Sequence, residues 1–175
     1  MHPIIPQIIG IAAVVAFLAS YQMKHRRGII LLNVVSRTLY ILQYLLLGAI
    51  SGAVLDILGA IASILASKKD APFIKKHIRA VILTVDLAIV AFGLALYENV
   101  FSLLPITGVL LHTGAFWLSN ERIIRRVSLL GSPFWFVYNF VSHAYGSAAG
   151  DLLTMVSIVT AMIKYRENKG KSQNV

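Results

Sequence analysis

Two ionisable residues lie inside apolar runs of the sequence, where a charged side chain is costly. Arg37 lies in the run 28–47 and Asp56 in the run 50–67. At a helical rise of 1.5 Å per residue, Arg37 is about 14 Å and Asp56 about 9 Å from the start of its run. If the two runs are neighbouring antiparallel helices, a long arginine side chain can reach the carboxylate. We predict an ion pair, either facing a substrate or serving as a structural bridge between two costly charges.

Polar and aromatic side chains recur along one helix face in each of two stretches. In the first stretch, positions i, i+3, i+4, i+7 and i+11 carry Asn33, Ser36, Arg37, Tyr40 and Tyr44. The second stretch has the same character and carries Trp135, Tyr138, Asn139, Ser142 and His143. Because a stripe facing lipid would leave polar groups unpaired, the two stripes predict a central aqueous path. Tyr44 and Trp135 fit equally well as anchors at the membrane interface.

His112 shares a helix face with Pro105 and Gly108, which precede it by seven and four residues. An imidazole can change its charge near physiological pH, so His112 is a candidate for a proton-linked or substrate-contacting group. A hydrogen bond to a neighbouring helix is the commoner role of such a residue. Asp86 is expected to have a structural partner.

The sequence contains no motif that predicts an enzyme. Gly150 and Asp151 match part of the Gly-x-Gly-Asp signature of intramembrane aspartyl proteases, but Ala148 stands in place of its first glycine and no second carboxylate completes a dyad. Asp151 is expected to begin the last helix, where a negative charge is favourable. The chain has no cysteine and no metalloprotease or nucleophile-elbow motif. We expect no catalytic residue, metal ion or cofactor.

Membrane-spanning helices are the elements that would position these residues. The chain has 175 residues, of which 58% are hydrophobic and 13% charged, and its mean hydropathy is +0.78. A soluble domain has about 45–50% apolar and about 25% charged residues. Because one crossing needs about 20 residues, we predict seven transmembrane helices, or six with a re-entrant segment. The apolar runs lie at about 3–20, 28–47, 50–67, 80–97, 100–118, 128–144 and 149–165.

Basic residues predict the orientation of these helices. Of the 16 Lys and Arg residues, 15 lie in the connections after the first, third and fifth runs or at the C-terminal end of the chain. Since Lys and Arg accumulate on the cytoplasmic side, the N-terminus is predicted outside and the C-terminus in the cytoplasm. The basic loop 68–79 is expected to contact anionic lipid head groups. The net charge of +9 is spread between apolar runs, so we expect no nucleic-acid partner.

The chain also resembles itself at a fixed offset, which is typical of transporters built from repeated helix groups. An offset of 99 residues pairs Pro6 with Pro105, Ala16 with Ala115, Ser20 with Ser119, Arg26 with Arg125 and Arg27 with Arg126. An offset of 98 residues pairs Tyr40 with Tyr138, Gly48 with Gly146, Gly52 with Gly150 and Leu55 with Leu153. The first three helices are thus predicted to repeat as the last three in the same orientation. Chance matching in apolar sequence is the competing explanation.

Several short stretches resemble a known family. These are 103–108, the run 46–49 followed by Gly52, and Asn139-Phe140 ahead of Gly146 and Gly150. Over about residues 1–165 the chain is similar to the YgjV family of bacterial inner-membrane proteins. More distantly, its three-one-three helix arrangement resembles the SWEET sugar facilitators and the PnuC vitamin transporters.

The SWEET resemblance implies positions that contact the solute. It implies a polar and an aromatic residue on the second helix of each bundle, here Ser36 with Tyr40 and Phe134 with Tyr138. It also implies asparagines on the third helices, where this chain has Asp56 and Thr154. Arg37 is matched by Trp135 in the second half, so the path is expected to be electrostatically asymmetric.

Together these features predict an all-α integral membrane protein with two parallel triple-helix bundles and a linker helix. The bundles cover 1–67 and 99–165, the basic loop and linker helix cover 68–98, and a cytoplasmic tail covers 166–175. We predict a multi-pass protein of the bacterial inner membrane that carries a small polar solute by rocking of the bundles about a midplane site. A non-transporting scaffold or assembly partner is the alternative. The candidate solute-binding residues are Asn33, Ser36, Arg37, Tyr40, Asp56, His112, Trp135, Tyr138, Asn139 and Thr154.

Overall fold

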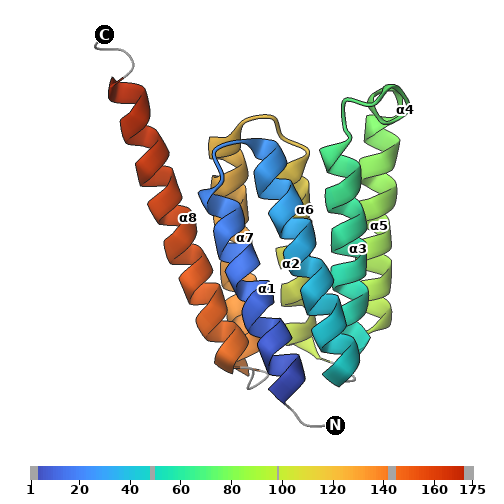
Figure 1. Cartoon of the computed structure of the whole chain (residues 1–175). Helices are drawn as coiled ribbons and strands as arrows, with labels where there is room; N and C mark the ends of the chain where they lie inside the picture. The colour runs from blue at the N-terminus through green and yellow to red at the C-terminus, as the bar shows by residue number, and fades with distance from the viewer. Residues whose placement is uncertain (1–3, 48–49, 98, 142–144, 172–175) are drawn as a thin grey trace.

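The computed structural model of the chain describes residues 4–47, 50–97, 99–141 and 145–171, and in these ranges it is helical without strands. Seven long helices run up and down the molecule (Figure 1). They are α1 (Ile4–Gln22), α2 (Arg26–Leu47), α3 (Ile50–Ser67), α5 (Ile78–Ala95), α6 (Leu103–Phe116), α7 (Glu121–Val141) and α8 (Tyr145–Lys171). Two short elements, α4 (Pro72–Lys76) and the 3-10 turn η1 (Val100–Ser102), precede α5 and α6.

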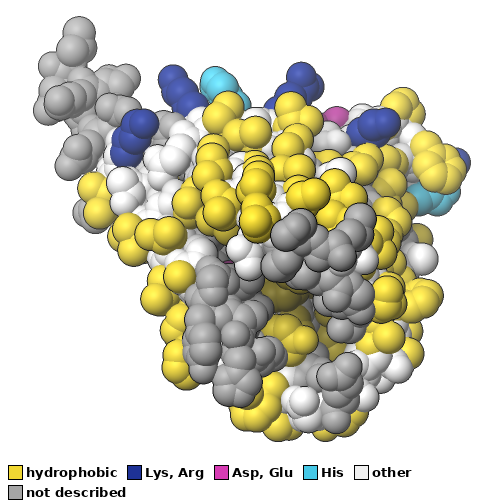
Figure 2. All heavy atoms as spheres, turned by 60° about the horizontal axis from the view of Figure 1, so that its bottom comes forward, with side chains coloured by type: hydrophobic (Ala, Val, Ile, Leu, Met, Phe, Trp, Pro, Cys, Tyr) yellow, Lys and Arg dark blue, Asp and Glu magenta, His cyan; other side chains and the backbone are white. Residues whose placement is uncertain are grey.

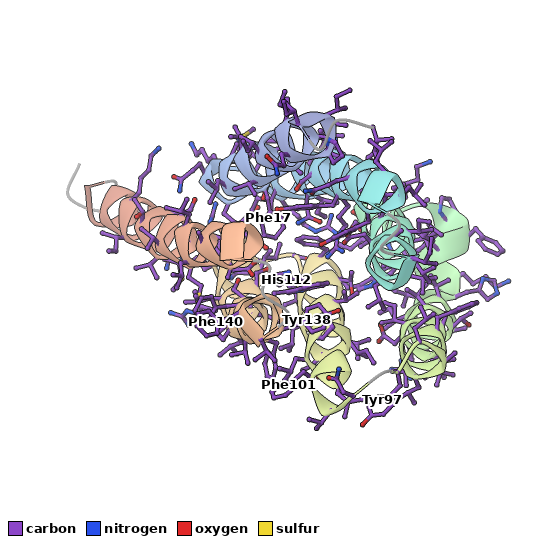
Figure 3. The ribbon with its side chains drawn as sticks, turned by 90° about the horizontal axis from the view of Figure 1, so that it is seen from below. Phe17, Tyr97, Phe101, His112, Tyr138 and Phe140 are labelled. Carbon is purple, nitrogen blue, oxygen red and sulfur yellow. The ribbon has the colours of Figure 1, made fainter. Side chains whose placement is uncertain are left out.

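Six of the long helices form a closed ring. Along the ring, α1 packs on α2, α2 on α3, α3 on α6, α6 on α7, α7 on α8, and α8 on α1 again. Helix α5 packs against α3 and α6 from outside the ring, where Ile89 joins Leu55, Ile106 and Val109 in an apolar cluster. The view along the helix axes shows this ring around a central space that side chains enter (Figure 3).

The polarity of this ring is inverted relative to a soluble bundle. Its outward faces carry large apolar side chains such as Ile8, Leu31, Leu130 and Val156, which are 60–65% exposed. Its interior holds buried polar side chains, among them Asn33, Arg37, Asp56 and His112. Apolar residues outside and ionisable residues inside are the arrangement that a lipid solvent favours.

Among the residues that the structure describes, three helices are long and apolar enough to cross a membrane, by length and composition. They are α1, residues 26–46 of α2, and α5. The apolar stretches Gly52–Ser67 and Leu103–Phe116 are shorter, and α6 at 14 residues spans about 21 Å. The fold is therefore that of an all-α membrane protein.

Two helices begin before their apolar runs, and the expectation that Asp151 begins the last helix is wrong. Helix α7 begins at Glu121, before the run at 128, and the side chain of Arg125 near its start is buried. Helix α8 begins at Tyr145, so Asp151 does not begin the last helix. It lies nearly two turns inside α8, beyond the region where a helix N-terminus stabilises a carboxylate.

The basic side chains gather at one end of the bundle, which we call the basic end. This end holds the connection between α1 and α2, α4, the connection between α6 and α7, and the C-terminal part of α8 (Figures 1 and 2). Beneath it lies an apolar layer of buried side chains, including Tyr21, Ile29, Phe116, Ile124 and Ile158. The alternation of basic and non-basic connections predicted from the sequence is confirmed by this arrangement.

Candidate functional site

The ring of six helices encloses a pocket toward the end opposite the basic end. The pocket has a cavity volume of about 50 Å³ and is partly open to solvent. Each ring helix contributes to the lining, which consists of Phe17, Arg37, Tyr40, Tyr44, Asp56, His112, Trp135 and Asp151. Figure 2 shows the molecule with this end turned forward and a hollow between its helices.

The predicted ion pair between Arg37 and Asp56 is confirmed. Nη1 of Arg37 donates to Oδ1 of Asp56 at 2.7 Å, and the two side chains are only 4% and 7% exposed. Nε of Arg37 donates to Oδ1 of Asn33 at 3.0 Å, one turn earlier on the same helix. The pair joins α2 to α3 and puts an arginine that is held by two acceptors into the pocket wall.

A glycine on α3 makes this position of Arg37 possible. A Cβ atom at Gly59 would lie 2.2 Å from Nη1 of Arg37 and 2.7 Å from its Cζ. The guanidinium therefore lies flat on the backbone of α3, in the space that a side chain would occupy. The sequence by itself does not connect Gly59 with the charged pair.

His112 forms the inner end of the pocket together with Phe17. Its ring nitrogen Nε2 lies 2.8 Å from the carbonyl oxygen of Ser128 on α7. A carbonyl oxygen only accepts, so Nε2 donates and the Nδ1 atom of a neutral ring is the acceptor. The rings of Phe17 and His112 lie 5.8 Å apart, and Figure 3 shows both residues inside the helix ring. A Cβ at Gly131 would lie 2.7 Å from the His112 ring.

Aromatic side chains form much of the remaining wall. Tyr40 and Tyr44 stack with ring centroids 6.1 Å apart, and Trp135 meets Tyr138 edge to face at 6.5 Å. The indole of Trp135 lies over Gly108, whose Cβ would come within 2.6 Å of it. Tyr44 and Trp135 thus line the pocket.

Comparison with known proteins identifies the family of the chain. A family model for bacterial inner membrane proteins, Imp-YgjV, matches residues 4–169. The chain belongs to the YgjV family. No curated protein and no solved structure matches it, so the expected relationship to the SWEET and PnuC transporters stays a prediction.

Half of the ten residues predicted for this YgjV-family protein line the pocket, namely Arg37, Tyr40, Asp56, His112 and Trp135. The others have different surroundings. Ser36 donates to the carbonyl of Ala13 on α1 at 2.7 Å, and Thr154 donates to the carbonyl of Gly150 in its own helix at 2.9 Å. Asn33 accepts a hydrogen bond from Arg37, and the ring of Tyr138 contacts that of Trp135 edge to face. The side chain of Asn139 lies outside the described part of the structure.

Two lining residues were missed by sequence reasoning. Phe17 matches Phe116 at the repeat offset of 99 residues, but a phenylalanine in an apolar run is not by itself marked as a pocket residue. Asp151 was interpreted as a helix start, whereas it lines the pocket from α8. The signal that could have placed it is the cost of a carboxylate inside an apolar run, the same argument that found Asp56.

The pocket lining offers groups that could bind a solute through charge, hydrogen bonds and apolar contact. An arginine, two carboxylates and an imidazole offer charged and neutral hydrogen-bonding groups, and the aromatic rings offer flat apolar surface. Within the described ranges, no group of three or more His, Asp and Glu side chains could hold a metal ion. The site therefore resembles a binding pocket for a small solute with both polar and apolar parts.

Proposed function

We propose that this YgjV-family protein carries a small polar solute across the bacterial inner membrane, by rocking of two three-helix repeats about the central pocket. The observation that carries the proposal is the pocket itself, which places ionisable side chains inside a ring with an apolar exterior. Charged groups in a membrane protein are costly and usually face a cavity or path that uses them. A scaffold with this fold would be expected to fill the same space with apolar side chains.

The neighbour relationships of the helices support two repeats. In the proposed repeat, α1, α2 and α3 correspond to α6, α7 and α8. The packing of α1 on α2 then corresponds to that of α6 on α7, and the packing of α2 on α3 to that of α7 on α8. The packing of α8 on α1 likewise corresponds to that of α3 on α6. The sequence matches at offsets of 99 and 98 residues follow the same correspondence. Helix α5 is then the linker that gives both repeats one orientation.

The two ends of the ring support alternating access. The pocket lies toward one end, whereas the buried layer with Tyr21, Phe116 and Ile124 fills the ring toward the basic end. By the positive-inside rule the basic end lies in the cytoplasm, so the pocket faces outward and the N-terminus lies outside. In the other state, the layer opens and the pocket mouth closes, as expected for rocking of repeats around a fixed site.

Solute uptake by proteoliposomes tests the proposal. We expect accumulation of at least one member of a panel of small polar metabolites above the level in protein-free vesicles. Asp151→Asn removes a lining carboxylate and should lower this uptake, whereas Asp86→Asn removes a carboxylate from α5, outside the pocket lining, and should not. Absence of uptake across the panel, or equal effects of the two variants, would favour the scaffold alternative.

A further inference from the structure

Two buried or half-buried arginines at the basic end reach across the ring to backbone carbonyl groups. Arg26, at the start of α2, donates from Nε to the carbonyl of Leu118 at 2.8 Å and from Nη2 to that of Phe116. Arg125, near the start of α7, donates from Nη2 to the carbonyl of Met23 at 2.6 Å and from Nε to that of Tyr21 at 3.2 Å. Each arginine thus binds carbonyls at the C-terminal end of a helix in the opposite half of the chain.

The two interactions correspond to one another under the proposed repeat. Arg26 and Arg125 are separated by the repeat offset of 99 residues. Arg26 connects α2 to the end of α6, and Arg125 connects α7 to the end of α1, so exchanging the repeats converts one connection into the other. Nη2 of Arg26 also donates to the carbonyl of Ala66, near the end of α3, at 2.6 Å. This bond connects Arg26 to a second helix of its own repeat.

The acceptors are groups that a cation stabilises well. The last carbonyls of a helix have no partner within the helix and carry partial negative charge. Arg125 is 2% exposed, so its charge needs acceptors within the fold, which include these carbonyls and the carbonyl of Glu121 at 3.5 Å. Lys69 adds a third cation at the same place, donating to the carbonyl of Trp117 at 3.1 Å. Burial lowers the pKa of Lys69, and the nearby charge of Arg26 lowers it further.

The contacted carbonyls lie one helical turn beyond the inner end of the pocket. Phe17 precedes Tyr21 by four residues on α1, and His112 precedes Phe116 by four residues on α6. Moving the ends of α1 and α6 apart would therefore separate Phe17 from His112, which meet at 5.8 Å. The carbonyls and arginines released in this way lie next to the connecting loops, where water can solvate them.

We propose that Arg26 and Arg125 form a reciprocal latch, which holds the basic end closed and must release before the pocket can open to the cytoplasm. The latch rests on the proposed transport function, because it regulates access to the same site. Arg27 and Arg126, the next residue in each case, are exposed and serve as matched controls of the same type and charge.

Cysteine labelling tests the latch, because the chain has no native cysteine. Ala115→Cys places a thiol in the buried layer on α6, and Tyr40→Cys places one in the pocket wall. The full-length protein is reconstituted in vesicles with one orientation. For Ala115→Cys, an impermeant maleimide is added on the side of the membrane that the basic end faces. For Tyr40→Cys, it is added on the opposite side. Each cysteine is combined with the double variant Arg26→Gln, Arg125→Gln or with the control Arg27→Gln, Arg126→Gln.

The latch predicts opposite changes at the two sites. In the latch variant, Ala115→Cys should react at least about tenfold faster and Tyr40→Cys more slowly, since loss of charged hydrogen bonds shifts a two-state equilibrium by such factors. The control variant should match the parent protein. Faster labelling at both sites would indicate unfolding and overturn the latch, as would unchanged labelling or an equal effect of the control. The uptake assay with unmodified protein tests transport separately from this result.

Discussion

The guanidinium of Arg37 lies against the backbone of Gly59, so that a methyl group at Gly59 would come within 2.2 Å of Nη1. Gly59 and Asp56 both lie on α3. The side chain of Arg37 lies across the backbone of α3 at Gly59 and so reaches the carboxylate of Asp56. Trp135 over Gly108 and His112 against Gly131 repeat this relationship between α6 and α7. The pocket wall is thus built from large side chains that occupy the space above glycines.

Replacing Gly59 with alanine should displace Arg37 and weaken its bond to Asp56. Overpacking of this kind typically costs about 1–3 kcal/mol, so the detergent melting temperature should fall. Gly114→Ala is the matched control, because a Cβ at Gly114 meets no atom within 4 Å. Equal melting temperatures for the two variants would show that Arg37 is not held against Gly59.

The charges of Arg37 and Asp56 should be strongly coupled in folding stability. Asp56→Ala alone leaves a buried cation without its acceptor, which typically costs about 3–5 kcal/mol. The double variant Arg37→Gln, Asp56→Ala should melt above the worse single variant, because it removes the unpaired charge. Melting of both singles and the double measures this coupling, and additive effects would mean that the two residues do not interact.

Uptake by that double variant separates the two roles of the pair. A solute-facing pair predicts a folded double variant that no longer takes up the solute, because the charged hydrogen-bonding partners are lost. A purely structural bridge predicts retained uptake. Uptake is compared at equal amounts of folded protein, measured by monodisperse elution in detergent.

Replacing Gly108 with alanine should push Trp135 into the pocket. The chain has two tryptophans, so Trp117→Phe leaves Trp135 as the single emitter. In that background Gly108→Ala should shift the emission to longer wavelength, because the indole moves toward the more polar pocket, and should slow uptake. Gly114→Ala in the same background should do neither, and an unshifted spectrum for Gly108→Ala would count against the contact.

Single cysteines should establish which end of the molecule faces the cytoplasm. An impermeant thiol reagent added outside intact cells should label Tyr97→Cys, between α5 and α6, and should not label His25→Cys, Asp70→Cys or Glu121→Cys at the basic end. Labelling of both sets from outside would contradict the predicted orientation. Permeabilised cells, in which all four should react, control for accessibility.

Local physics was sufficient to predict several features from the sequence. The rise of a helix and the cost of a buried charge placed Arg37 and Asp56 within reach of one another, and the structure joins them at 2.7 Å. The alternation of basic connections predicted which helix ends lie together. These inferences succeed because they depend on one helix, or on two helices joined by a short connection.

Only the tertiary structure decided which faces of the helices meet. Ser36 lies on the same stripe as Arg37, yet its hydroxyl bonds to α1 while Arg37 turns to α3. Phe17 and Asp151 enter the pocket because α1 and α8, at opposite ends of the chain, are neighbours in the ring. The cross-ring contacts of Arg26 and Arg125 join residues more than 90 positions apart. A helical period shows which residues share a face, but packing against distant helices determines what that face contacts.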